Sequence, residues 1–591
     1  MYLENINGPE DLKRLSVDEL RKLAKEIRTA LIDKTSAVGG HIASNLGLVE
    51  LTMAMHYVFD SPRDRFIFDV SHQCYVHKML TGRAYAYIDP DKYGEVSGFT
   101  NPEESEHDLF RTGHTATSIS LACGMAKARN LAGRNEKIVV VIGDGSLSGG
   151  EALEGLDFCG SEIDGNLIII FNDNQMSIAE NHGGIYNNLS LLRETKGKAE
   201  NNLFKAFGLD YRFIEDGNNI GEVLSVLDDV KDLHHPVVIH ACTLKGKGYD
   251  FAEADPEFFH WAVPFVQETG KVKREFNGER YDKIARDFLI EKMKKDKDVT
   301  TLIAAVPGAL AFDPDIRKAI GKQFVDVGIA EEHAISMAGG IAKNGGKPVF
   351  VTLSTFYQRV FDQIAHEISI NKLPITMIVA NASVYAVNEM THIGIFDIPM
   401  LSNIPNLVYL APTNKQEYLA MLDWSIDQKQ YPVAIRAPRN GVFYAKGSVD
   451  TDYSNINKYL VTRNGSKVAV IALGDFYQLG EEVCDALKTS CDIEATLINP
   501  RYITGLDIEL LQELVKSHQL IVTLEDGVLD GGFGQKIASF YGQEKVRVLN
   551  FGLKKEFLDR YNVNDVLKEN LLTSEQIQAR IKEIMAEISL G

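Results

Sequence analysis

The sequence has few of the features that would place the protein outside an ordinary globular class. It has only 6 cysteines and no CxxC pair, which argues against a disulfide framework and predicts reduced thiols in a cytoplasmic protein. Apolar runs are too short to span a bilayer, so we expect no membrane segment. We also expect no signal peptide, because residues 16–19 predict a capping box that opens an amphipathic helix. Low-complexity tracts and short internal repeats are absent as well.

Positive charge is also in deficit. The formal net charge of −20 argues against nucleic acid and anionic membrane surfaces as partners, because both would repel the chain. No GxGxxG motif follows a predicted strand with an acidic residue about twenty positions later, which disfavours a Rossmann-type dehydrogenase. By contrast, 591 residues with 45% apolar content are ample for large cores, and we expect about three domains.

Buried apolar strands alternate with amphipathic helices along the whole chain. This alternation predicts an α/β fold of three doubly wound domains with mostly parallel sheets. We expect the domains at residues 1–271, 279–447 and 460–591, with a polar, charge-rich linker at 268–280. The expected strands include residues 137–142, 167–171, 348–352, 375–380, 407–411, 468–472 and 520–524.

The segment from Gly143 to Asn174 has the pattern of a site for diphosphate and magnesium. The first strand ends at a Gly-Asp-Gly turn, and the N–H groups of a following helix, approached through glycines, suit phosphate oxygens. Magnesium takes about six oxygen ligands. Asp144, Asn174 and the backbone carbonyl of Met176 supply three of them. A lone Gly-Asp-Gly turn is common in structural roles, but Asn-Asp-Asn at the end of the second strand favours the cofactor site.

Further motifs lie in order along nearly the whole chain. They are GGHIASNLG at 39–47, FDVSHQ at 68–73, HKMLTGR at 77–83, GHTATS at 113–118, IAEEH at 329–333, STFYQR at 354–359, THIGIFD at 391–397, APR at 437–439, NPR at 499–501 and EDGVLDGG at 525–532. Together with the segment from Gly143 to Asn174, they resemble the 1-deoxy-D-xylulose 5-phosphate synthase family of the transketolase group. Several motifs in one order are far more specific than any one of them.

The resemblance implies thiamine diphosphate and Mg²⁺ as cofactors. It implies that the first domain binds diphosphate and Mg²⁺, that the second binds the pyrimidine ring, and that the third is a transketolase C-terminal domain. The cofactor-binding residues implied are His72, Gly113, His114, Ala116, Gly143, Asp144, Gly145, Ser146, Asn174, Met176, Ile178, Glu331 and Phe356.

The catalytic residues implied by the resemblance are Glu331, His41, His260 and His392. In the family a glutamate shares a proton with a ring nitrogen of the cofactor, and an apolar cleft suits this role because it makes a carboxyl hold its proton more tightly. The alternative for Glu331 is an acid at a helix N-terminus. A single histidine is usually a satisfied core residue, but these fall on family motifs.

The residues implied for substrate binding are Arg359, Arg439, His41, Asn381 and Asn388. A guanidinium group suits bidentate contact with a phosphate, although a surface or interdomain ion pair is the alternative for both arginines. Phe356 is similar to the residue that stacks on the aminopyrimidine and Ile178 to one beneath the cofactor, and core packing is the alternative for both.

The function implied is the joining of pyruvate to D-glyceraldehyde 3-phosphate with loss of CO₂, giving 1-deoxy-D-xylulose 5-phosphate for isoprenoid, thiamine and pyridoxal biosynthesis. The partners expected are small-molecule substrates and a second copy in a homodimer. The chain departs from the family pattern where the sugar phosphate should bind: Asn381 stands in place of an arginine and Asn388 in place of an aspartate. The stretch after Asn181 is also shorter than in typical members.

These departures leave two alternatives open. One is a divergent transketolase-like paralogue that forms acyloins from a different donor or acceptor. The other is a cofactor-binding protein with little turnover. The presence of Asp144, Asn174 and Glu331 at the cofactor positions weighs against the second alternative.

Overall fold

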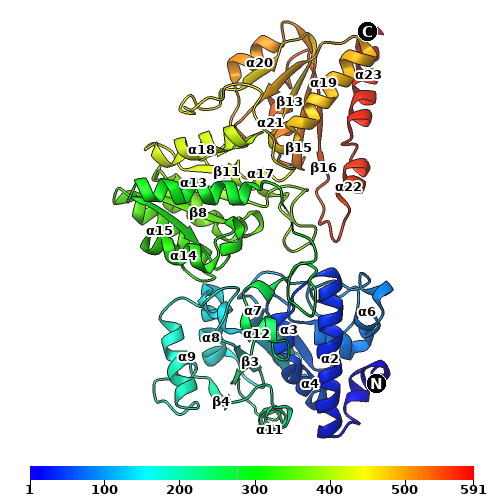
Figure 1. The fold of residues 1–591 in the computed structure, drawn as a ribbon, viewed down its shortest axis with the longest axis vertical. Coiled ribbons are helices and arrows are strands. Elements are labelled where there is room, and N and C mark those ends of the chain that lie inside the picture. Colours follow the sequence, from blue (N-terminus) through cyan, green and yellow to red (C-terminus); the bar gives the residue numbers. More distant parts are fainter. Residues whose placement is uncertain (276, 591) are drawn as a thin grey trace. The chain divides into compact units, whose positions relative to one another are not determined.

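The computed structural model describes residues 1–275 and 277–590 and divides into two compact units (Figure 1). Unit 1 comprises Met1–Asn277 with Gly328–Ala330, and unit 2 comprises Gly278–Val327 with Glu331–Gly591. The boundary after Asn277 falls within the expected linker. The described residues form three sheets, one in unit 1 and two in unit 2. The three domain boundaries given above stay predictions.

Unit 1 contains a five-stranded, wholly parallel sheet in the order β1-β2-β3-β5-β4. Alternate residues of its central strands contribute to two different buried clusters, as a doubly wound sheet requires: Val139 and Val141 lie in one, and Val140 and Ile142 in the other. The strands are β1 Arg65–Phe68, β2 Ile138–Gly143, β3 Ile168–Asp173, β4 Asp210–Ile214 and β5 Val237–Cys242.

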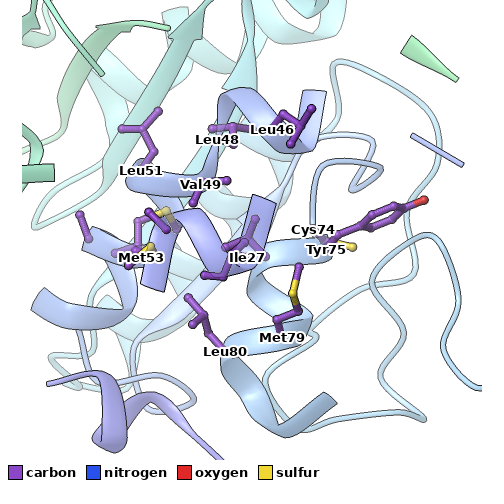
Figure 2. Packing of buried hydrophobic residues seen from close by; sticks show 14 of the residues in the cluster. Ile27, Leu46, Leu48, Val49, Leu51, Met53, Cys74, Tyr75, Met79 and Leu80 are labelled. Carbon is purple, nitrogen blue, oxygen red and sulfur yellow. The ribbon is translucent and has the colours of Figure 1, made fainter. Parts of the chain in front are cut away.

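The helices of unit 1 cover its sheet on both faces. Figure 2 shows one of the two clusters, where Ile27 of the long helix α2 packs with residues such as Val49 and Leu80. The predicted capping box is confirmed, since Ser16 and Glu19 hydrogen bond reciprocally at the start of α2. The helices are α1 Pro9–Leu12, α2 Val17–Val38, α3 Ala43–Gly47, α4 Val49–Val58, α5 Tyr75–Lys78, α6 Tyr85–Ile88, α7 Ser118–Leu131, α8 Gly150–Glu162, α9 Ile185–Glu194, α10 Leu203–Ala206, α11 Ile220–Val230 and α12 Asp250–Ala254.

Unit 2 contains two sheets. The first is six-stranded and wholly parallel in the order β10-β11-β9-β8-β6-β7; the second has five strands in the order β12-β14-β13-β15-β16, with only β12 antiparallel to its neighbour. The predicted α/β class with mostly parallel sheets is therefore confirmed. The strands are β6 Val299–Ile303, β7 Phe324–Asp326, β8 Lys347–Leu353, β9 Thr376–Ala380, β10 Val408–Leu410, β11 Val433–Arg436, β12 Leu460–Arg463, β13 Lys467–Ala472, β14 Thr496–Asn499, β15 His518–Val528 and β16 Arg547–Leu553.

The two sheets of unit 2 are joined by a shared core and by buried charges. One apolar cluster contains residues from both sheets, and Arg436 of β11 forms ion pairs with the buried carboxylates of Asp397 and Asp526. The helices are α13 Tyr281–Lys295, α14 Pro314–Ile320, α15 Glu331–Lys343, α16 Phe361–Gln363, α17 Asp397–Leu401, α18 Lys415–Asp427, α19 Tyr477–Cys491, α20 Ile508–Leu514, α21 Phe533–Phe540, α22 Val563–Glu569 and α23 Ser574–Leu590. Among the described residues, no helix combines the length and apolarity needed to cross a membrane.

Candidate functional site

The carboxyl ends of β2 and β3 bring the predicted magnesium ligands to one edge of the sheet in unit 1. Gly143 pairs with Asn172 across the two strands, so the residues that follow them leave the sheet side by side. The helix expected directly after the Gly-Asp-Gly turn begins with a 3₁₀ turn over Asp144–Ser148, and α8 starts only at Gly150. A Cβ atom on Gly145 would lie 2.9 Å from the Cα of Ser177, so only glycine lets the two loops approach this closely.

The carboxyl group of Asp144 is the strongest indication of a cation site at this edge of the sheet. Its side chain is almost fully buried, and Oδ2 accepts a hydrogen bond from Asn181 Nδ2 at 2.9 Å. Oδ1 is buried without a hydrogen-bond partner. Burial, together with the nearby Asp173, raises the pKa of Asp144 to about 8, against the opposing charge of Lys245. A buried carboxylate oxygen without a donor fits a cation ligand.

Asn174 and Met176 lie in a tight turn beyond the end of β3. The Oδ1 atom of Asn174 accepts the backbone N–H of Met176 at 3.1 Å, which fixes the turn and leaves a second lone pair on the amide oxygen. Gln175 between them adopts a left-handed φ of 66°. Ile178, predicted to lie beneath the cofactor, is only partly buried, two residues further along the loop.

Lys245 is a residue that sequence reasoning missed. Its side chain is 4% exposed, and Nζ donates to the carbonyl of Ser177 at 2.6 Å, in the loop that follows Asn174. Burial lowers the pKa of Lys245 to about 8, and the charge of Asp144 opposes this shift. The only signal in the sequence is that Lys245 directly precedes Gly246 shortly after a buried strand, and a lysine in such a loop is more often solvated.

Three of the predicted histidines form a cluster in unit 1. The ring centroid of His41 lies 4.9 Å from that of His72 and 5.6 Å from that of His260, and those of His72 and His260 are 5.1 Å apart. A pair of backbone hydrogen bonds between Gly40 and Ala262 holds two of these loops together. Burial lowers the pKa of His260 well below its usual value, and the positive charge of Lys245 acts in the same direction. This environment favours the neutral imidazole.

The loop with Gly113, His114 and Ala116 packs against the Gly-Asp-Gly loop. Ala116 has a left-handed φ of 72°, and its N–H donates to Asp69 Oδ2 at 3.0 Å. A Cβ atom on Gly149, just beyond the buried Ser146, would lie 2.6 Å from the Cβ of Ala116. The predicted diphosphate-binding residues therefore come from adjoining loops of unit 1.

The segment Gly328–Ala330 returns to unit 1 from the middle of the chain. The N–H of Ile329 donates to Ser148 Oγ at 2.8 Å, and Ser148 Oγ in turn donates to the carbonyl of Gly145. Glu331 is the next residue after this segment and begins α15 of unit 2.

Glu331 is buried at the start of α15, with 2% of its surface exposed. Burial raises the pKa of its carboxyl group, and the charge of Arg359 opposes this rise. Arg359 Nη1 lies 3.6 Å from Glu331 Oε2, beyond hydrogen-bond distance. Arg359, predicted to contact the acceptor phosphate, therefore lies beside the predicted catalytic acid.

Phe356 and His392 lie together in the same unit. Their ring centroids are 5.7 Å apart in an edge-on arrangement. His392 Nδ1 is 2.9 Å from Thr391 Oγ1 and 3.2 Å from Glu389 Oε2. Sequence reasoning missed Glu389, which had no motif position of its own and orients the imidazole through a local turn.

The other residues predicted to bind substrate make contacts to protein groups. Asn381 follows β9 with a left-handed φ of 55°, and its carbonyl approaches Gly394 so closely that a Cβ there would lie 2.0 Å away. Asn388 is exposed, and its Nδ2 donates to the carbonyl of Tyr561 at 3.4 Å. The N–H of Arg439 donates to the buried carboxylate of Asp475 at 2.9 Å. Arg439 Nε is buried without a hydrogen-bond partner.

Known proteins resemble the chain over its full length. It is 37% identical to the 1-deoxy-D-xylulose-5-phosphate synthase of Alkaliphilus oremlandii, an alignment that covers 99% of this chain and 100% of the relative. The enzyme of the same name from Lachnoclostridium phytofermentans is 39% identical, with 98% of both chains covered. The chain belongs to the 1-deoxy-D-xylulose-5-phosphate synthase family.

Family models divide this member of the 1-deoxy-D-xylulose-5-phosphate synthase family into three matched regions. Residues 3–200 match 1-deoxy-D-xylulose-5-phosphate synthase, residues 280–443 match the transketolase pyrimidine binding domain, and residues 457–577 match the transketolase C-terminal domain. The chain is thus a transketolase-type transferase, and the family implies dependence on thiamine diphosphate. The solved transketolase of Campylobacter jejuni subsp. jejuni aligns with 96% of this chain and 100% of its own, at 16% identity and a TM-score of 0.45, too low to carry a conclusion by itself.

Proposed function

We propose that this chain joins pyruvate to D-glyceraldehyde 3-phosphate with loss of CO₂, giving 1-deoxy-D-xylulose 5-phosphate. The observation that carries the proposal is the buried, partnerless Oδ1 of Asp144 at the predicted cofactor edge, in a chain whose relatives of that name align over its full length. The same relatives favour this synthase over a paralogue with other substrates and over a binding protein with little turnover.

Asp144, Asn174 and the carbonyl of Met176 would hold Mg²⁺ against the diphosphate. The fit rests on the donor set, a carboxylate and an amide oxygen at the ends of adjacent strands, and on the uncompensated acceptor of Asp144. The backbone at Gly143, Gly145 and Ser146 would face the phosphate oxygens. His72, Gly113, His114 and Ala116 would complete the anion site, and Lys245 would balance part of the charge.

When bound, thiamine diphosphate supplies the electron sink for decarboxylation of the donor. Glu331 would hold a proton on its carboxyl group and share it with a ring nitrogen of the cofactor, with Phe356 stacked on the pyrimidine and Ile178 beneath the cofactor. The raised pKa of the buried Glu331 carboxyl supports this role. Ile329, two residues before Glu331, contacts Ser148 within unit 1.

His41, His260 and His392 would move protons to and from the substrate carbonyls. A neutral imidazole both donates and accepts a hydrogen bond, and the lowered pKa of His260 keeps that histidine in this form near pH 7. Glu389 would orient His392 through its Nδ1 atom.

Arg359, Arg439 and His41 would contact the acceptor, the two arginines at its phosphate. Asn381 and Asn388, also predicted to bind substrate, make their contacts with protein groups. The buried, partnerless Nε of Arg439 supports its part in this role. We also propose that the enzyme is a homodimer of the cytoplasm; homodimers are usual in the transketolase group, and the 6 cysteines are unpaired thiols, as a reducing compartment requires.

Product analysis tests the proposed function. Purified protein with Mg²⁺, thiamine diphosphate, ¹³C-labelled pyruvate and D-glyceraldehyde 3-phosphate should release labelled CO₂ and form 1-deoxy-D-xylulose 5-phosphate, identified by NMR. Omission of either cofactor should abolish the product. A different ketose would support the paralogue, and CO₂ release without any coupled product would remove the synthase assignment.

A further inference from the structure

Helix α9, Ile185–Glu194, contacts both corners of the predicted metal site in unit 1. At one corner, Tyr186 OH donates to the carbonyl of Asp144 at 3.1 Å and lies 3.4 Å from that of Gly145. At the other corner, Arg193 Nη1 lies 2.6 Å from Asp173 Oδ2. Asp173 directly precedes Asn174, a predicted metal ligand. Residues seven positions apart share one helix face about 10.5 Å apart along the axis, so a single rigid element spans the two strand ends.

Helix α9 is also anchored in the core. Leu189 and Leu192 are fully buried in the apolar cluster that also contains Ile142 of β2 and Phe171 of β3. The segment that leads into the helix is attached as well, because Asn181 donates to Asp144 Oδ2. The helix is therefore held by apolar contacts beneath the sheet edge and by polar contacts at both of its ends.

Asp173 links Arg193 to the turn that carries Asn174 and Met176. Its Oδ2 is also 2.8 Å from His240 Nε2, and His240 Nδ1 is 2.8 Å from Tyr211 OH. Its Oδ1 accepts the N–H of Gln175 at 3.2 Å, inside the turn between Asn174 and Met176. The carboxylate is thus fixed on one side by a buried histidine and on the other by Arg193, and it holds the turn in place.

A second metal ion is the competing explanation for this cluster. Among the described residues, Asp173, His240 and Cys242 are close enough to hold one. Arg193 Nη1 already lies 2.6 Å from Asp173 Oδ2. The positive guanidinium would repel a cation bound to the same carboxylate. The arginine favours a structural network.

We propose that α9 is a clamp that pre-forms the Mg²⁺ and diphosphate site, with Tyr186 and Arg193 as positioning residues. Tyr186 fixes the backbone at Asp144 and Gly145, and Arg193 fixes the turn at Asn174 through Asp173. This inference rests on the cofactor site of the proposed function. Residues that hydrogen bond to metal ligands typically change metal affinity by about 10- to 100-fold when they are mutated. We expect an effect of this size on cofactor affinity from loss of the clamp.

Calorimetric titration of the full chain with thiamine diphosphate in Mg²⁺ tests the clamp. Arg193→Met should raise the Kd of the cofactor by about 10-fold or more, and Tyr186→Phe by less, because the hydroxyl holds backbone atoms only. Arg193→Lys, which keeps the charge, should recover part of the loss. At saturating cofactor, the kcat of the variants should approach that of the wild type.

Arg212→Met is the matched control, because Arg212 lies on β4 of the same sheet and pairs with the exposed Asp229. It should leave the Kd unchanged. Unfolding midpoints of the cofactor-free proteins identify a purely structural effect. The clamp is overturned if Arg193→Met and Tyr186→Phe bind with the wild-type Kd, or if affinity falls only in step with stability. If the wild type itself does not bind thiamine diphosphate, the proposed function fails before the clamp is tested.

Discussion

The predicted cofactor residues of unit 1 and the predicted acceptor residues of unit 2 differ in how their polar atoms are used. Asp144 has a buried oxygen without a partner, in a loop held by Asn181 and Tyr186. Asn381 instead lies in a turn with a left-handed φ of 55°, and Asn388 donates to the carbonyl of Tyr561 in the loop between β16 and α22. Asp144 therefore has an oxygen that no protein group occupies, whereas Asn381 and Asn388 contact other segments of the protein. Among the acceptor residues, Arg439 is the one with a buried polar atom that lacks a partner.

A large effect is expected on the cofactor side, from Asp144→Ala. Loss of the carboxylate should lower the affinity for thiamine diphosphate in Mg²⁺ by more than about 100-fold, the upper end for groups one step further out. The cofactor-free variant should unfold no earlier than the wild type, because it loses a buried carboxylate with an unpaired oxygen. Calorimetry and thermal unfolding measure the two quantities. Wild-type affinity in the variant would remove Asp144 from the metal site.

Glu331→Gln should lower decarboxylation of pyruvate by about 10²- to 10⁴-fold, the range of a positioned proton-transfer group. The amide keeps the shape of the side chain, so cofactor affinity should change only slightly. Glu332→Gln is the control, since Glu332 is the neighbouring acid and is only partly buried. Steady-state CO₂ release and calorimetry provide the readouts. Equal rates for both variants would mean that Glu331 serves the helix N-terminus alone.

On the acceptor side, Asp475→Asn should raise the KM for D-glyceraldehyde 3-phosphate several-fold and leave CO₂ release from pyruvate unchanged. Asp475 accepts the N–H groups of Arg439 and Asn440 at 2.9 and 3.3 Å, and each such bond to a charged group contributes about 1.5–3 kcal/mol. An amide oxygen replaces these bonds only in part. If the KM for pyruvate rises in parallel, the effect is not confined to the acceptor loop.

The same variant has a predicted dependence on pH. Burial, with the nearby Asp526, raises the pKa of Asp475 to about 7 from its usual 3.8. The folded state therefore binds this proton more tightly than the unfolded state does. Its contribution to the free energy of unfolding is fully present below pH 3.8 and is lost as pH rises to about 7. Asp475→Asn should gain stability relative to the wild type across that window. Urea unfolding at several pH values measures the difference, and a constant difference would contradict the assigned shift.

The smallest effect is expected from Asn388→Ala. The side chain is exposed and makes one long hydrogen bond to a carbonyl, so the free energy of unfolding should change by less than about 0.5 kcal/mol. The KM for the acceptor should stay within about two-fold of the wild type by the same reasoning. A large rise in this KM would show that Asn388 contacts the substrate. The difference drawn above between the polar atoms of Asp144 and those of Asn388 would then be wrong.

Local patterns predicted the fold and placed the candidate magnesium ligands after two neighbouring strands, while their role as ligands stays a prediction. The apolar run predicted as a strand at 137–142 forms β2, Ile138–Gly143, because its buried β-branched residues suit only the centre of a parallel sheet. Lys245 escaped prediction because its role depends on a loop that returns from a distant strand. The position of Arg359 beside Glu331 likewise depends on the turn over Ser354–Val360 being a 3₁₀ helix, where residues three apart, such as Phe356 and Arg359, share one side.

The most direct test of the account compares acceptors with and without phosphate. With Mg²⁺, thiamine diphosphate and pyruvate, kcat/KM for D-glyceraldehyde 3-phosphate should exceed that for D-glyceraldehyde by at least about 10-fold, since one guanidinium–phosphate contact contributes about 1.5–3 kcal/mol. Arg439→Met should remove most of this preference while leaving CO₂ release intact. Equal kcat/KM for the two aldehydes in the wild type would contradict the synthase account and identify an enzyme that does not recognise the acceptor phosphate.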